Sequence, residues 1–396
     1  MQYDFDKIIP RKGTYSEKWD AVRQIYPEAT EKAIPMFVAD MDFPSPKPVV
    51  DAMHRVADFQ IYGYTTPQTE PEFARSLCRW FENYHHWTIS PEEVIVSSGT
   101  FGALEHGVKL FTEEGDGVIL MPPVYGHFAD AIENEWHRKV AANHLLCDKE
   151  GDYTIDFNDL EVKCANPKNR VLIFCSPANP VGRVWTTEEI LQVEAICTKH
   201  DVFVIADEVH CDHLRRGVVH HPYLSVCKDK SRAMAIVGVN KSFNMAGLSC
   251  SNAIIQDKGL REKFLRDYIY PQPGAFAVAG QIAAYNEGRD WMEQVCAYIE
   301  ENIDFAIDFF HREMPKVKVK KPQGTYCLWL DFREYGLSEE ELHRRIYKEA
   351  QVILQDGIIH DPQEGQGRQR MCVPCPRPLL KKALERLAAA FEDRKS

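Results

Sequence analysis

Several segments of this chain are short, continuously apolar runs that stop at a polar or turn-forming residue. Residues 171–175 and 202–206 are such runs, and they alternate with stretches whose apolar residues recur at helical spacing. A strand that is apolar on both faces must be covered by helices on both sides, which is typical of a parallel sheet. The sequence therefore predicts an α/β fold with its reactive groups at the carboxyl ends of the strands.

Length and element order together predict two domains. A chain of 396 residues is long for a single hydrophobic core. Strands and helices alternate from about residue 61 to residue 286, and after residue 290 helices flank two strand-like segments. We expect residues 49–289 to form a large domain and residues 290–396 a small α+β domain. Residues 1–48 are expected to be an N-terminal arm that joins the small domain.

Composition narrows the partners and the compartment. Acidic residues outnumber basic residues by 59 to 47, which gives a net charge of -12 and argues against nucleic acid as a ligand. The first residues lack the pattern of a signal peptide, and no apolar run approaches the roughly 20 residues of a membrane span. The 12 cysteines lie in apolar surroundings, as buried thiols in a reducing compartment do. We expect a cytoplasmic protein that does not bind a membrane.

Two sequence clusters resemble metal sites, but neither predicts one. Cys372 and Cys375 have C-x-x-C spacing without a second close pair to complete a zinc site. In the segment 210–213, potential ligands stand next to each other at a strand end, where adjacent side chains point in different directions. We expect no metal at either place.

Lys241 and Asp207 carry the most specific chemistry. Asp207 ends the apolar run 202–206, and Lys241 follows the next such run along the chain. A lysine amine can form a Schiff base with pyridoxal phosphate (PLP), while a carboxylate keeps the pyridine nitrogen of that cofactor protonated. The turn at residues 97–102 also leaves backbone N–H groups free at a helix N-terminus, which is how proteins bind phosphate without a cationic side chain.

In this order, the motifs resemble the class I/II aminotransferase superfamily of PLP enzymes over essentially the whole chain. The resemblance implies fold type I, with a large mostly parallel-sheet domain and a smaller α+β domain formed by both chain ends. It also implies roles for individual residues. Lys241 would carry the cofactor, Asp207 would pair with its pyridine nitrogen, Asn179 would bind its phenolic oxygen, Gly99, Thr100 and Phe101 would bind its phosphate, Tyr125 would lie over its ring, and Arg370 would bind the substrate carboxylate.

Four motifs are similar to the carbon–sulfur lyase branch of that superfamily, which includes cystathionine β-lyases. They occupy residues 38–44, 62–64, 207–212 and 241–248. The resemblance places His210 near the phenolic oxygen of the cofactor. It also implies that Tyr64 reaches the cofactor phosphate of a neighbouring subunit and, with Asn179, helps Arg370 to bind substrate. This arrangement requires a homodimer.

The branch leaves the reaction open between alternatives. A lyase would eliminate a thiol from a cysteine S-conjugate and yield pyruvate and ammonia, with Tyr125 stabilising the departing sulfur. An aminotransferase would use the same Lys241, Asp207 and Arg370 with a 2-oxo acid. A binding or regulatory role, by docking on another protein, is a third hypothesis. The chain also departs from the wider superfamily at Gly238 and Ser249, where residues that contact the phosphate are common.

Overall fold

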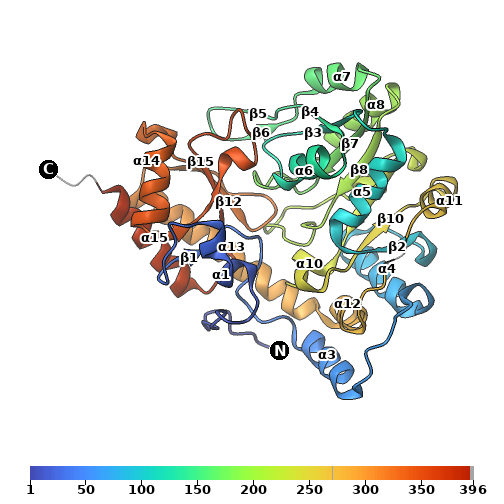
Figure 1. Ribbon diagram of the computed structural model, residues 1–396, viewed down its shortest axis with the longest axis horizontal. Helices are drawn as coiled ribbons and strands as arrows, with labels where there is room; N and C mark the ends of the chain where they lie inside the picture. Colours follow the sequence, from blue (N-terminus) through green and yellow to red (C-terminus); the bar gives the residue numbers. More distant parts are fainter. Residues whose placement is uncertain (270, 393–396) are drawn as a thin grey trace.

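The computed structural model describes residues 1–269 and 271–392, and a seven-stranded sheet forms its largest layer (Figure 1). In spatial order the strands are β2 (Val94–Ser97), β10 (Ser251–Ile254), β9 (Ala233–Val237), β8 (Phe203–Asp207), β7 (Asn169–Cys175), β3 (Gly117–Leu120) and β4 (Lys139–Ala142). β10 is antiparallel to both of its neighbours, and the other pairs are parallel. This mostly parallel sheet confirms the predicted α/β class.

Helices cover both faces of this sheet, as the apolar strands predicted. Consecutive residues of β8 belong to different hydrophobic clusters, Val204 to one and Ile205 to the other. The cluster of Val204 includes side chains from α7 (Phe157–Ala165), α8 (Thr187–Lys199), α9 (Tyr223–Val226) and α12 (Ala275–Glu287). The cluster of Ile205 includes α5 (Gly99–Phe111), α6 (His127–Asp130) and α11 (Lys258–Arg266). A capping box of Thr186 and Glu189 is present at the start of α8.

A smaller antiparallel sheet lies in the C-terminal part of the chain. Its strands, in spatial order, are β11 (Lys318–Val319), β12 (Cys327–Asp331), β15 (Arg368–Cys372) and β14 (Gln355–Asp356). It is accompanied by α13 (Arg289–Glu313), α14 (Glu339–His343) and α15 (Arg377–Phe391). α14 is regular only as far as His343, and a π-helical turn continues it from Arg344 to Glu349.

The two ends of the chain meet in this C-terminal part. β1 (Ile34–Pro35) pairs in parallel with β13 (Val352–Ile353), and Figure 1 shows the blue N-terminal segment beside the red C-terminal helices. The short helices α1 (Glu17–Asp20) and α2 (Val22–Ile25) belong to the same N-terminal segment. The pairing accords with an arm that joins the small domain, while the boundaries at residues 48 and 289 stay predictions.

The remaining elements frame the site described below. They are α3 (Lys47–Phe59), α4 (Pro71–His85), α10 (Val239–Ser242) and the hairpin of β5 (Leu146–Cys147) with β6 (Tyr153–Thr154). α12 contacts both α3 and α4, and α3 projects from one end of the molecule in Figure 1. Within the described residues, no helix combines the length and apolarity needed to cross a membrane.

Leu384→Ala should destabilise the C-terminal part of the molecule. The apolar face of α15, with Leu380, Leu384, Leu387 and Phe391, is buried in the core. Truncating a buried leucine costs about 2–5 kcal/mol because a cavity remains. Denaturant melts should show this loss, whereas Lys382→Ala on the exposed face of the same helix should melt like the wild type. Equal melts for the two variants would contradict the packing of α15.

Candidate active site

The carboxyl ends of the central strands open onto a cavity of about 190 Å³. It contains most of the residues predicted from the sequence, although they come from distant parts of the chain. Its lining residues are Ala39, Thr100, Phe101, Tyr125, Phe128, Cys175, Asn179, Asp207, Val209, His210, Asn240, Lys241 and Ala246. The cavity lies where parallel α/β sheets place their ligands, because the strand ends are free of covering side chains there.

Strand register explains why these side chains converge. Asp207 is the last residue of β8 and is paired with Cys175, the last residue of β7. The segments that follow the two strands therefore start side by side and carry His210 and Asn179 to the same cavity. Lys241 reaches it from α10, the single helical turn that follows β9.

The Lys241 amine is held at the cavity wall by a main-chain group. Its Nζ donates a hydrogen bond of 2.8 Å to the carbonyl of Ala39. The same carbonyl accepts a hydrogen bond of 3.1 Å from the hydroxyl of Tyr326. Burial, followed by the charge of Arg370, lowers the pKa of Lys241. A larger fraction of its amine is therefore uncharged at neutral pH, which is the form that acts as nucleophile or base.

Asp207 is a buried carboxyl group without a cationic partner among the described residues. It is 5% exposed, and its Oδ1 accepts a 3.3 Å hydrogen bond from the Val209 N–H. Burial raises its pKa to about 7, against the opposing effects of the Val209 N–H and the Lys241 charge. A protonated ring nitrogen beside Asp207 would supply the missing countercharge, since a nearby opposite charge favours the ionised form.

Arg370 lies on the smaller sheet and contacts Asn179, but it does not itself line the cavity. It is 2% exposed on β15, and its Nη1 donates to Asn179 Oδ1 at 3.1 Å. Its Nη2 donates to the carbonyl of Phe37 at 2.7 Å, and its Nε has no hydrogen-bond partner among the described residues. A buried guanidinium with an unused N–H is ready to receive an anion.

His210 and Tyr125 are both uncharged in this cavity. Burial, with the charges of Lys241, His213 and Arg370, lowers the pKa of His210 well below its ordinary value. Its Nδ1 is buried without a hydrogen-bond partner in the described part of the chain. Burial also raises the pKa of Tyr125, so that its hydroxyl keeps its proton and can donate it.

The predicted phosphate turn is present, with one change of detail. Thr100 and Phe101 line the cavity in the first turn of α5, and the N-cap Ser98 makes no side-chain cap there. The N–H of Gly99, however, donates a hydrogen bond of 3.1 Å to the carbonyl of Ser249. Thr100 and Phe101 are therefore better placed than Gly99 to offer N–H groups to an anion.

Packing accounts for the two unusual residues beside that turn. A Cβ on Gly238 would lie 2.9 Å from Ser251 Oγ and 3.2 Å from Ser251 Cα, so a larger residue there requires β10 to move. Ser249 adopts a left-handed conformation with φ 49 and uses its carbonyl to hold Gly99. Both residues thus serve the backbone of the turn.

Within one chain, Tyr64 does not join this cavity. Its side chain is 94% exposed, in the segment between α3 and the helix that begins at Pro71. It lines a separate groove formed by α3, the segment after it and α12, with a volume of about 670 Å³. Any contact between Tyr64 and a ligand in the Lys241 cavity requires another copy of the chain.

The sequence did not predict the main-chain acceptors at Ala39 and Phe37. Backbone carbonyls have no residue-type signal, although the motif 38–44, quoted above for its resemblance, includes Ala39. The donor set of the cavity nevertheless fits PLP. Lys241 can bind its aldehyde carbon, Asp207 its ring nitrogen, Asn179 and His210 its phenolic oxygen, and Thr100 with Phe101 its phosphate.

Comparisons with known proteins agree over nearly the whole chain. Residues 32–387 match the profile of a family described as aminotransferase class I and II. The chain is 39% identical to cystathionine beta-lyase PatB of Bacillus subtilis strain 168, over 98% of this chain and 100% of that protein. Cystalysin from Treponema denticola, which contains pyridoxal 5'-phosphate, is 33% identical with a TM-score of 0.93, covering 99% of this chain and 100% of that one. The PLP-bound C–S lyase from Staphylococcus hominis is 29% identical with a TM-score of 0.92, covering 99% of each chain.

Asp207→Asn should stabilise the cofactor-free protein more at about pH 8 than at about pH 5. In the unfolded chain Asp207 ionises near its ordinary pKa of about 4, whereas burial raises its pKa to about 7 in the folded state. Between these values the folded state keeps a proton that the unfolded state has lost, so stability falls as pH rises. Asparagine cannot ionise and avoids this loss.

Thermal melts of the cofactor-free wild type and variant at both pH values measure the effect. Asp308→Asn, an exposed change on α13, is the matched control and should melt like the wild type at each pH. A stability difference for Asp207→Asn that does not grow with pH would contradict the raised pKa of Asp207.

Proposed function

The chain belongs to the class I and II aminotransferase family, and from this premise we propose that it catalyses β-elimination of cysteine S-conjugates such as cystathionine. The products are a thiol, pyruvate and ammonia. The observation that carries the choice of reaction is the full-length similarity to cystathionine beta-lyase PatB at 39% identity. The cavity around Lys241 supplies the groups that this reaction needs.

The enzyme uses PLP, which when bound accepts the electrons released at the substrate's Cα. Lys241 holds the cofactor covalently, and Asp207 keeps its ring nitrogen protonated. The first-turn N–H groups of Thr100 and Phe101 bind its phosphate. Asn179 and the uncharged His210, which both line the cavity, would hold its phenolic oxygen.

Lys241 also moves the proton from the substrate's Cα. When the substrate amine takes its place, the lysine amine becomes free beside that carbon. Its lowered pKa favours the uncharged form, which can accept a proton at Nζ. The Ala39 carbonyl, 2.8 Å from Nζ here, limits where the amine can lie.

Arg370 orients the substrate through its carboxylate. A guanidinium offers two parallel N–H donors to a carboxylate, which fixes the direction of the bonds at Cα. The buried Nε of Arg370 has no partner among the described residues, and Asn179 holds Nη1 from the cavity side. Asn179 therefore links the site of the cofactor to the site of the substrate carboxylate.

Tyr125 donates a proton to the departing sulfur. Burial raises the pKa of Tyr125, so its hydroxyl is protonated at neutral pH. A thiolate leaves more readily when a nearby acid stabilises it. The ring of Tyr125 packs edge-on against Phe101 and Phe128, which keeps the hydroxyl at the cavity.

We further propose a homodimer in which each subunit contributes Tyr64 to the other's site. Tyr64 and its neighbours Phe59, Ile61 and Tyr62 expose 94%, 70%, 66% and 61% of their surfaces. Large apolar side chains grouped in this way mark an interface, and a two-fold dimer is the commonest assembly. A cytoplasmic location is proposed as well, supported by 12 cysteines that all have free thiols.

Cystathionine should be cleaved without any added 2-oxo acid, and pyruvate should appear in proportion to the free thiol. Elimination regenerates the starting form of the cofactor, whereas transamination stops after one turnover unless a 2-oxo acid is present. Lys241→Ala should abolish turnover, and Tyr125→Phe should lower it while the ring remains in place. Turnover that depends on a 2-oxo acid and yields no pyruvate would instead support the aminotransferase alternative.

Mixing Lys241→Ala protein with Tyr64→Ala protein should restore activity that neither variant has alone. In a mixed dimer, one site combines Lys241 of one chain with Tyr64 of the other and is intact. Random exchange of subunits of a two-fold dimer should restore about a quarter of the wild-type activity. Sedimentation of the mixture checks that dimers form, and the absence of recovery despite subunit exchange would refute the shared site.

A further inference from the structure

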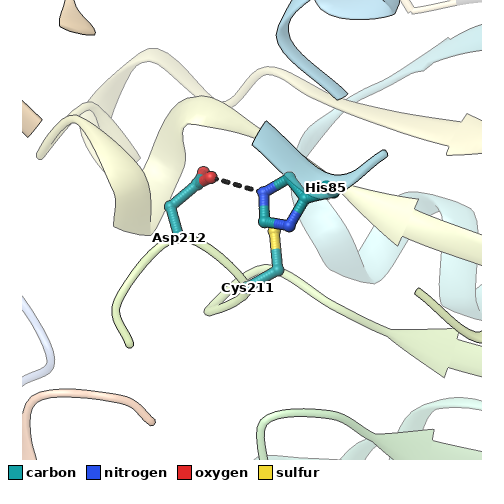
Figure 2. Close-up of side chains that lie close together, drawn as sticks. All are labelled: His85, Cys211 and Asp212. Atoms are coloured by element: carbon teal, nitrogen blue, oxygen red, sulfur yellow. Dashed lines mark hydrogen bonds and ion pairs between the residues drawn. The ribbon is translucent and has the colours of Figure 1, made fainter. Parts of the chain in front are cut away.

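Asp212 is a buried carboxylate beside α10, the helical turn that carries Lys241. Its side chain is 4% exposed. Its Oδ1 accepts hydrogen bonds of 2.9 Å from Trp80 Nε1 and 2.8 Å from His85 Nε2. Its Oδ2 accepts a hydrogen bond from the hydroxyl of Ser242. Figure 2 shows Asp212 and His85 pointing toward each other from different parts of the chain. Three donors thus converge on one carboxylate.

Asp212 is ionised despite its burial. Burial by itself acts to raise its pKa, but the hydrogen bonds from His85, Ser242 and Trp80 outweigh it and hold the pKa of Asp212 below its ordinary value. An ionised carboxylate can only accept hydrogen bonds, so the Nε2 of His85 must carry a hydrogen. The cluster is therefore a fully formed set of charge-assisted hydrogen bonds, which are stronger than neutral ones.

Two of these contacts act directly on the turn that carries Lys241. Ser242, whose hydroxyl donates a hydrogen bond to Asp212, directly follows Lys241 in the chain. His213, which follows Asp212, donates a hydrogen bond of 2.8 Å from its Nε2 to the carbonyl of Lys241. Burial lowers the pKa of His213 to about 4, so its ring is neutral and the hydrogen on Nε2 is fixed by this bond.

The turn needs this external support because it is short. α10 spans only Val239–Ser242, and the following N–H groups of Phe243 and Met245 bind the carbonyls of Val239 and Asn240. Asp212 and His213 belong to the same segment that begins with Asp207 at the end of β8. One segment thus carries the cavity carboxylate and also holds the backbone of the lysine.

We propose that Asp212 and His213 are positioning residues for Lys241, which they act upon through Ser242 and through the Lys241 carbonyl. They hold in place the backbone from which the lysine amine extends into the cavity. This inference rests on the proposed PLP function of Lys241. Neither Asp212 nor His213 lines the cavity, so they act without touching substrate or cofactor.

A cation is the competing explanation for the cluster in Figure 2. His85, Cys211 and Asp212 place possible ligand atoms within 4.8 Å of one another. Both oxygens of Asp212, however, already accept hydrogen bonds from Trp80, His85 and Ser242. Burial also raises the pKa of Cys211 well above its ordinary value, so the thiol keeps the proton that a metal would have to displace. The hydrogen bonds account for the cluster.

Ser242→Ala, prepared as the cofactor-loaded enzyme, tests the proposal because it removes the link between Asp212 and the lysine turn. Ser76→Ala is the matched control, since Ser76 is equally buried but its hydroxyl binds a carbonyl of its own helix, α4. Four quantities are measured: kcat and KM of the cofactor-loaded enzyme, the pH midpoint of its colour, and the rate at which added PLP forms its coloured link after the bound cofactor has been removed.

A displaced lysine should form the link about tenfold more slowly and lower kcat about tenfold, because small misplacements of reacting groups are costly. The pH midpoint should shift, and KM should change little, since Arg370 is untouched. Ser76→Ala should match the wild type in all of these. If Ser242→Ala behaves like Ser76→Ala, the proposal is wrong.

A second pair of variants decides the matter if Ser242→Ala does not fold. His213→Ala removes the donor to the Lys241 carbonyl, whereas His213→Gln retains an N–H donor. Glutamine should recover most of the rate of link formation that alanine loses, and equal rates for the two variants would overturn the proposal. Link formation and its pH midpoint need no substrate, so they remain decisive even if cystathionine is not cleaved and the proposed lyase reaction fails.

Discussion

The site depends on one constraint, which is that a sheet covered by helices on both faces can offer polar groups only at the ends of its strands. β8 is buried along its whole length and ends in Asp207. The carboxyl group at that end is enclosed, and burial raises its pKa to about 7. The reactive groups of the cavity are arranged around this carboxylate, because each must reach it from a loop or helix that follows a strand.

Two buried ionic clusters hold the walls of the cavity in place. Asp212 fixes the turn that carries Lys241, as argued above. Asp42 is bound by Lys18 at 2.8 Å and by Arg11 at 2.8 Å, and it follows closely after Ala39, whose carbonyl accepts a hydrogen bond from the Lys241 amine. Buried charges are tolerated only when they are paired, and breaking one pair is costly. Asp42 is paired with two cationic side chains, and Asp212 with three hydrogen-bond donors.

The sequence predicted the parts of the molecule that have a local signal. Apolar runs identified central strands of the large sheet. Matching motifs singled out Lys241, Asp207 and Asn179, and all three line the same cavity. The carbonyls of Ala39 and Phe37 were missed because main-chain acceptors leave no trace in residue identity. The bonds of Asp212 with His85 and Trp80 were missed because they join segments far apart in the chain. The role predicted for Tyr64 stays a prediction, because Tyr64 lies outside the cavity of its own chain.

The central claim is that Lys241, in the helical turn that follows β9, is the residue that binds PLP. Borohydride reduction of the purified, cofactor-loaded protein fixes the cofactor to whichever lysine holds it, and mass spectrometry of the digested protein then identifies that residue. We expect the added mass of the reduced cofactor on the peptide that contains Lys241. Its presence on another lysine, or its absence from every lysine in protein that retains the cofactor, would contradict the account.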